Sequence, residues 1–207
     1  MIELPAAKAL IDPFAQRLTD IHEAAVASWA TLLKDFPAFA MPLDATTRWR
    51  AIHNHVWSGI CRDFDTDPDA RPNDKTGVQG VVIAGQIFLR FKYVGHGEPR
   101  SYPTTQQTHM TRQHYSDKMF DALVDDPSLG LPTILTCGYT LDGPKLGRVE
   151  IRRDCEGHLP WFYDIYGGTT IVMPQSLPGQ QDDTKPARVT KRTAAQGEDA
   201  ADANAAS

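Results

Sequence analysis

The feature that most constrains the fold is a change in hydrophobic period along the chain. Up to about residue 64, apolar side chains recur every three or four residues, which is the spacing of one face of an α-helix. After residue 77, β-branched and aromatic residues come in short runs that are separated by turn residues, which is typical of β-strands. Helices followed by strands in this way predict an α+β fold.

Two helices are predicted in the first part of the chain. The first covers residues 12–35, with Asp12 as N-cap and Pro13 as the first helical residue. Pro37 and Pro42 then interrupt the helical pattern, and Asp44 is positioned to cap a second helix. That helix carries one apolar stripe, formed by Trp49, Ile52, Val56, Ile60 and Phe64. Together the two helices form an N-terminal helical hairpin.

The second part of the chain predicts a five-stranded, mainly antiparallel sheet with the hairpin packed on one face. The expected strands are residues 77–84, 86–94, 133–141, 148–152 and 160–166. A polar helix within residues 101–124 is inserted between the second and third strands, and Thr104 and Gln107 fit a capping box at its start. Residues 63–75, which are rich in Asp and Pro, are expected to form an exposed acidic loop.

Composition divides the 207 residues into one domain, 1–173, and a disordered C-terminal tail, 174–207. Leu177 and Val189 are the only bulky apolar residues of the tail, so it cannot bury enough surface to offset the entropy of ordering it.

The chain has no apolar run long enough to span a membrane and no export signal near its start. Three cysteines without metal-ligand spacing argue against a disulfide framework and a zinc knuckle, and predict a cytoplasmic location.

Charge restricts how the protein could bind an anionic partner. The 21 Lys and Arg residues are outnumbered by 26 Asp and Glu residues, which gives a net charge of -5. The molecule as a whole therefore does not attract nucleic acid or anionic lipid, and such a partner requires a local cationic patch. Residues 86–118 supply one, because they hold five Lys or Arg residues and only two acids, a net charge of +3.

A cationic face is predicted from strand alternation. Residues two apart in a strand point to the same side, so Arg90 and Lys92 share a face, as do Arg148, Glu150 and Arg152 on a later strand. If both sets lie on the face that the helices leave open, the sheet presents a mostly cationic surface that suits a phosphate-bearing ligand. The alternative is a solvent-exposed face whose charges pair with one another.

The polar segment 102–115 supplies the candidate catalytic residues. His109 is positioned as a general acid or base and Arg112 as the group that stabilises developing negative charge, as a metal-free ribonuclease requires. Arg100, Thr104 and Gln106 join Arg90, Lys92 and Arg152 as expected ligand-binding residues. No cofactor is predicted. The alternative interpretation is an ordinary capped surface helix.

Two patterns in the sequence could indicate a metal site. His53 and His55 are two residues apart, so on a helix they face different directions, and His53 is interpreted as a core or interface histidine. Asp142 followed by Glu150 and Arg152 imitates a magnesium-dependent nuclease site. An arginine cannot replace the lysine of such a site as a base, and Asp142 with its following glycine fits a hairpin turn. No metal site is therefore predicted.

Four short segments resemble a group of uncharacterised bacterial proteins. They are residues 87–92, residues 102–107, Cys137-Gly138-Tyr139 and Trp161, and the resemblance covers about residues 77–167. Matching positions are Arg90, Lys92, Pro103, Thr104, Gln106, Gly138 and Tyr139. Members of the group are encoded beside helix-turn-helix regulators that carry a metallopeptidase-like domain. The resemblance implies a toxin–antitoxin or phage-defence setting and supplies no catalytic residue.

Two functions from different classes follow. The first is a toxin-like or defence-associated effector that acts on nucleic acid or a nucleotide. The second is a non-catalytic antitoxin, inhibitor or adaptor that uses the helical hairpin as a surface for a cognate protein; Trp49, Trp57 and Phe64 favour it because they lie on more than one side of the second helix. The sequence leaves open whether the protein is an enzyme and what its oligomeric state is. No membrane partner is expected.

Overall fold

The computed structural model describes residues 2–75, 78–94, 133–155 and 158–172, all of which belong to a unit that spans Met1–Gln175. Its helices are α1 (Leu4–Ile11), a 3-10 turn η1 (Asp12–Phe14), α2 (Ala15–Asp35), α3 (Pro37–Ala40) and α4 (Ala45–Phe64). Its strands are β1 (Ala70–Lys75), β2 (Val78–Ile83), β3 (Ile87–Tyr93), β4 (Thr133–Asp142), β5 (Lys145–Cys155), β6 (His158–Asp164) and β7 (Thr170–Val172). The predicted polar helix and the predicted tail lie outside the described residues.

The helical hairpin is confirmed, with one change at its start. Asp44 caps α4 as predicted, because its Oδ1 accepts a hydrogen bond of 2.7 Å from the backbone N–H of Thr47. The first long helix begins at Ala15 instead of residue 12, since Pro13 lies in the 3-10 turn and a separate helix, α1, precedes it. Pro5 near the start of α1 is compatible with a helical first turn, where its missing N–H leaves no hydrogen bond unmade.

The strands form one sheet in the order β1-β2-β3-β4-β5-β6-β7. Neighbouring strands are antiparallel except for β3 and β4, which are parallel. The α+β class and the mainly antiparallel sheet are therefore confirmed, whereas the predicted number of five strands is too low. Within the described ranges, β7 is additional, and β1 occupies part of the segment that was expected to be an acidic loop.

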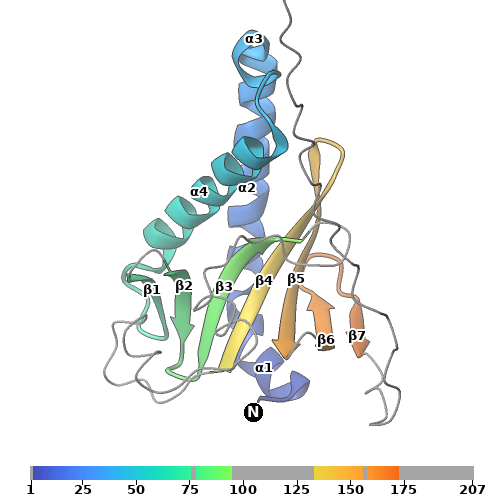
Figure 1. Cartoon of the computed structure of the whole chain (residues 1–207). Helices are drawn as coiled ribbons and strands as arrows, with labels where there is room; N and C mark the ends of the chain where they lie inside the picture. The colour runs from blue at the N-terminus through green and yellow to red at the C-terminus, as the bar shows by residue number, and fades with distance from the viewer. Residues whose placement is uncertain (1, 76–77, 95–132, 156–157, 173–207) are drawn as a thin grey trace, which may run out of the picture. The chain divides into compact units, whose positions relative to one another are not determined.

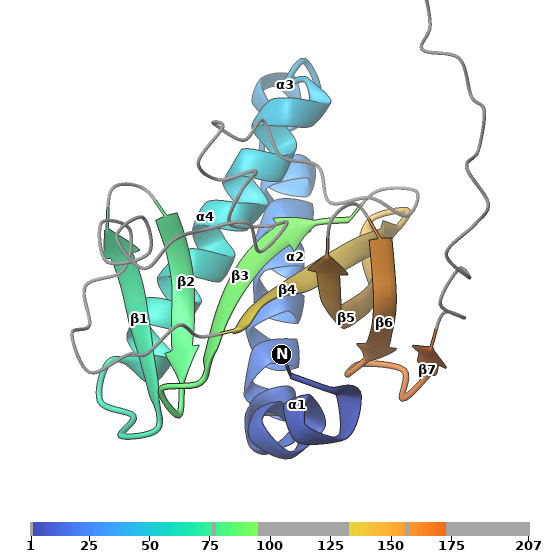
Figure 2. The same cartoon turned by 60° about the horizontal axis from the view of Figure 1, so that its bottom comes forward.

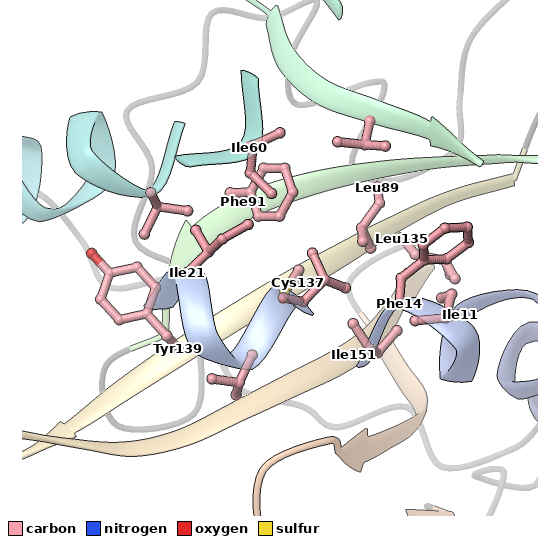
Figure 3. Close-up of a cluster of buried hydrophobic side chains, with 14 of the residues drawn as sticks. Ile11, Phe14, Ile21, Ile60, Leu89, Phe91, Leu135, Cys137, Tyr139 and Ile151 are labelled. Atoms are coloured by element: carbon pink, nitrogen blue, oxygen red, sulfur yellow. The ribbon is translucent and has the colours of Figure 1, made fainter. Parts of the chain in front are cut away.

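Helices α2 and α4 lie on the same side of the sheet (Figures 1 and 2). Figure 3 shows the core between them and the strands, where Ile21 of α2 and Ile60 of α4 meet side chains of β3, β4 and β5, among them Leu89, Phe91, Cys137 and Ile151. Each such side chain contributes about 1.5–3 kcal/mol when it is fully buried. Gly59 allows α4 to approach α2 closely, since a Cβ there would lie 2.8 Å from Cγ2 of Ile21.

The end of the hairpin projects beyond the sheet. In Figure 1, α2 and α4 continue past the strands and are joined at their far end by α3. Three large apolar side chains are exposed there: Phe36 (62%), Phe39 (65%) and Met41 (76%). None of the helices that the structure describes combines the length and the apolar character that crossing a membrane requires.

Candidate functional site

Several charged residues of β3, β5 and β6 are aligned in two rows across the sheet. Strand pairing aligns Arg90 with Thr136 and Thr136 with Arg152 in the first row. It aligns Lys92 with Gly138, Gly138 with Glu150, and Glu150 with Asp164 in the second. The intervening residues, such as Leu89, Phe91, Cys137 and Ile151, belong to the core on the helix side. Alternation therefore places the rows on the opposite face. We call Arg90, Lys92, Thr136, Arg148, Glu150, Arg152 and Asp164 the polar face.

The polar face is more buried than the sequence suggested. Arg90 and Arg152 are each only 3% exposed, so the expectation of a cationic surface open to solvent is wrong for these two residues. Lys92 is half-buried, and the Arg148 side chain is 46% exposed. Accessible positive charge is thus concentrated at Lys92 and Arg148, toward the carboxyl ends of β3 and β4.

Both acids of the polar face have structural partners. Glu150 lies between two arginines, with 3.2 Å from its Oε1 to Nη1 of Arg152 and 3.7 Å from its Oε2 to Nη2 of Arg148. Burial raises the pKa of Glu150, and the charges of the two arginines oppose that rise. Asp164 accepts a hydrogen bond of 2.9 Å from the backbone N–H of Tyr166, which holds the turn after β6.

Burial acts in the same direction on both cations of β3. Burial lowers the pKa of Arg90 to about 10. Burial and the neighbouring charge of Arg90 lower the pKa of Lys92 to about 8, so Lys92 still carries its proton at neutral pH. Among the residues that the structure describes, none forms a hydrogen bond or an ion pair with Lys92. An anion at this position would relieve the repulsion between the two cations.

The structure does not assemble the carboxylate pair of a magnesium-dependent nuclease. Asp142 pairs with Lys145 at the β4–β5 turn, whereas Glu150 pairs with Gly138, four residues earlier in β4. That offset separates the two carboxylate residues by about 13 Å along the strand. Within the described ranges, no three His, Cys, Asp or Glu side chains are grouped so that they could hold a metal ion.

Of the predicted ligand-binding residues, the structure brings Arg90, Lys92 and Arg152 to one face. The other predicted site residues lie outside the described ranges; they are Arg100, Thr104, Gln106, His109 and Arg112. The polar helix on which they were expected therefore stays a prediction.

His53 is part of a hydrogen-bonded chain beside the sheet. Its Nε2 lies 3.0 Å from Oε1 of Gln79, and Nε2 of Gln79 lies 3.3 Å from Oδ2 of Asp74. Because a carboxylate only accepts, Gln79 donates to Asp74 with its amide group, and its oxygen accepts a hydrogen bond from Nε2 of His53. Burial lowers the pKa of His53, with smaller contributions from the charges of Lys92 and Arg90. Its interpretation as a core or interface histidine agrees with this position.

A second polar cluster, which the sequence did not reveal, lies on the helix side of the sheet where the hairpin begins to project. The ring of Trp49 stacks on Tyr93 with 3.6 Å between centroids, and the Arg48 guanidinium lies 4.2 Å from the Trp49 centroid. Tyr93 and Tyr139 occupy paired positions in β3 and β4, with 5.5 Å between their rings. His22 of α2 lies 5.5 Å from the Tyr139 ring. We call Arg48, Trp49, Tyr93, Tyr139 and His22 the hairpin-base cluster.

The tryptophans that suggested a partner surface pack within the protein. Trp49 and Trp57 are partly buried against the core, and Phe64 is completely buried. The aromatic residues of α4 therefore have intramolecular contacts. Among the described residues, the most exposed large apolar side chains are those of the hairpin tip.

Comparisons with known proteins do not assign this chain to a family. A scan against models of protein families, a search of curated proteins and a search of solved structures each returned no match.

Proposed function

We propose that the polar face binds a phosphate-bearing ligand, a nucleic acid or a nucleotide, and that the protein is a toxin-like or defence-associated effector. The observation that carries the proposal is the charge on one side of the sheet. On strands β3 to β6, four cations, Arg90, Lys92, Arg148 and Arg152, share it with two acids, Glu150 and Asp164. Both acids already have protein partners, and the accessible positive charge is concentrated at Lys92 and Arg148.

The four cations have different roles in this proposal, because they are buried to different extents. Lys92 and Arg148 retain enough exposure to contact a phosphate directly. Arg90 and Arg152 are too buried to reach a nucleic-acid backbone, and they contribute positive potential from within the fold. Arg152 also positions Glu150, which in turn lies beside the guanidinium of Arg148. Contact through Lys92 and Arg148 would be to phosphate and would carry little sequence preference.

Cleavage is the catalytic part of the proposal. It assigns proton transfer to His109 and stabilisation of the developing negative charge to Arg112, without a metal ion. Its support is the residue types and spacing in the sequence, together with the resemblance to uncharacterised bacterial proteins, which implies a toxin–antitoxin or phage-defence setting.

Binding of labelled RNA, DNA and nucleotides to the purified protein at roughly 50 and 200 mM salt tests the binding proposal. We expect binding that weakens with salt and a loss of at least about fivefold in affinity for Lys92→Met, because one phosphate contact is removed. Lys145→Met is the matched control, since Lys145 is an exposed lysine at the start of β5, next to the β4–β5 turn. Equal affinities for Lys92→Met and Lys145→Met would contradict the proposal.

The same samples, incubated with and without EDTA, test the catalytic part. Cleavage that persists in EDTA and is lost in His109→Ala supports metal-free catalysis. Cleavage that EDTA abolishes contradicts it, because a metal ion would then be required.

A second candidate function is favoured by the exposed tip of the hairpin. Phe36, Phe39 and Met41 form an apolar patch at α3, and contiguous patches of this kind commonly mark protein–protein contacts. In this alternative the protein is a non-catalytic antitoxin, inhibitor or adaptor. The contact surface is then the tip of the hairpin, in place of the tryptophans of α4.

A further inference from the structure

Buried polar atoms without a protein partner gather in the hairpin-base cluster. Several buried side-chain atoms of the described residues have no hydrogen-bond partner, and four of them lie in this cluster: Nε of Arg48, Nε1 of Trp49, Oη of Tyr139 and Nε2 of His22. The residues Tyr139 and His22 are 0% exposed. Folded proteins satisfy nearly all of their buried polar groups, because a buried donor or acceptor that makes no hydrogen bond is costly. Four such atoms in one cluster therefore require an explanation.

The four groups are neighbours in space, although they come from three separate parts of the chain. Arg48 covers Trp49, Trp49 stacks on Tyr93, and Tyr93 meets Tyr139 edge-on. Burial raises the pKa of Tyr139 and the charge of Arg48 opposes the rise, which places the guanidinium within electrostatic reach of the hydroxyl. In Figure 3 the Tyr139 hydroxyl points away from the apolar cluster around Cys137 and Leu135.

The chemistry of these atoms selects an anionic ligand. Arg48 Nε–H, the Trp49 indole N–H and the Tyr139 hydroxyl are all hydrogen-bond donors, and Arg48 adds a permanent positive charge. A metal cation would be repelled by the guanidinium. His22 can supply an acceptor, because its Nδ1–H donates to the carbonyl of Leu18 at 2.7 Å and leaves the lone pair on Nε2. Carboxylate and phosphate oxygens accept hydrogen bonds from donors of these three kinds, and a ligand hydroxyl matches His22.

We propose that Arg48, Trp49 and Tyr139 form a binding site for an anionic oxygen group, a carboxylate or a phosphate, of a small molecule. The Trp49–Tyr93 stack forms the aromatic wall of the site, and His22 accepts a hydrogen bond from a hydroxyl of the same molecule. The site lies on the helix side of the sheet, so it is distinct from the polar face that contains Lys92.

Titration of the full-length protein with inorganic phosphate and with acetate tests the site, with sodium chloride at equal ionic strength as the reference. The readouts are the thermal midpoint, which rises when a ligand binds the folded state, and the indole N–H resonance of Trp49, assigned with Trp49→Phe. We expect at least one of the two anions to raise the midpoint and shift this resonance. We expect Arg48→Met to weaken binding at least about tenfold, because a charge-assisted hydrogen bond is lost.

Tyr139→Phe is the sharper variant, because it removes the hydroxyl and keeps the buried ring. We expect it to fold normally and to bind several-fold more weakly. Tyr163→Phe is the matched control: Tyr163 is also a buried tyrosine, and it lies on β6 near Trp161, with Asp12 as its polar neighbour, away from this cluster. Tyr163→Phe should retain binding of the anion, and Lys92→Met should retain the shift of the Trp49 indole resonance, which reports on this site alone.

Each outcome decides the proposal. Binding of phosphate alone identifies a phosphate-bearing ligand, and binding of acetate alone identifies a carboxylate. Binding of neither anion beyond the chloride reference overturns the proposal, as does binding that is unchanged in both Arg48→Met and Tyr139→Phe. Loss of phosphate binding in Lys92→Met, with Tyr139→Phe unaffected, would assign the anion to the polar face instead and would also overturn it.

Discussion

At the scale of single residues, the protein keeps several ionisable side chains inside the fold. His22 is the clearest example, because it lies completely buried between the rings of Phe91 and Tyr139. Burial lowers the pKa of His22 to about 4, although its hydrogen bond to the carbonyl of Leu18 opposes the change. The folded state therefore holds this imidazole neutral under conditions in which an unfolded chain begins to protonate it.

His22 predicts a loss of stability in mild acid. Its pKa is about 6.5 in the unfolded chain and about 4 in the fold, so between these values the unfolded state binds more protons. The free energy of unfolding is therefore full above pH 6.5 and falls as the pH drops toward 4, by about 2 kcal/mol at pH 5 relative to pH 7. Urea unfolding of wild type and His22→Leu at both pH values measures this difference.

We expect His22→Leu to lose that part of the pH dependence, whatever its effect on absolute stability. His55→Gln is the control, since His55 is an exposed histidine of the same hairpin, and it should retain the wild-type dependence. The same difference between pH 7 and pH 5 in wild type and His22→Leu would show that His22 does not cause the loss.

At the scale of elements, the packing of the central strands depends on Gly138. It lies in β4 between Lys92 of β3 and Glu150 of β5 in the second row of the polar face. A Cβ at this position would clash with Cγ2 of Val94 and would lie 3.4 Å from Cγ of Glu150. The missing side chain thus makes room for Val94, which is itself buried.

Gly138→Ala is expected to lower the free energy of unfolding by about 1–3 kcal/mol, because the added methyl group overpacks this position. Alanine otherwise suits a strand better than glycine does, so a loss would come from the contact with Val94. Val94→Ala in the Gly138→Ala background should recover part of it, which a double-mutant cycle by chemical denaturation measures. Equal stability of Gly138→Ala and wild type would exclude a close contact there.

Much of the element pattern could be predicted, because local sequence determines it. The apolar spacing and the cap at Asp44 located α4, and β-branched runs located β2, β3, β4, β5 and β6. The edge strand β1 could not be recognised: its sequence contains Pro72 and Asp74, which are disfavoured inside a sheet but tolerated at an edge. The parallel pairing of β3 with β4 joins strands that are distant in sequence, so no local signal encodes it.

For the candidate sites, too, only what the local sequence determines could be predicted. Alternation was sufficient to place Arg90 and Lys92 on one face, because it depends only on the strand itself. Their burial could not be inferred, since it depends on what packs around them in the fold. The hairpin-base cluster could not be found either, because His22, Arg48, Tyr93 and Tyr139 come from four different elements.

At the scale of the whole molecule, the described part of the chain combines a covered sheet with an uncovered helical tip. Where α2 and α4 lie over the strands, their apolar faces are buried. Beyond the strands, at α3, Phe36, Phe39 and Met41 are exposed. These side chains contribute little to the stability of the monomer, so their apolar character is explained better by a contact with another molecule.

The double substitution Phe36→Ser/Phe39→Ser tests this explanation. We expect the free energy of unfolding to change by less than about 0.5 kcal/mol per site, because both side chains are exposed. We also expect weaker retention on a hydrophobic-interaction column and less association in sedimentation experiments over a range of concentrations. A large loss of stability would instead mean that the tip packs within the monomer.

The single parallel pair of the sheet has a kinetic consequence. Strands β1, β2 and β3 are neighbours in sequence, as are β4 to β7, so either group can pair through short connections. Joining β3 to β4 requires the closure of a much longer chain segment, residues 95–132, and the entropic cost of that closure must be met before the contact becomes favourable. Pairing of β3 with β4 therefore raises the contact order of the chain and is the step that slows its folding. It is also the contact through which two separately synthesised fragments, divided within residues 95–132, would have to recognise each other.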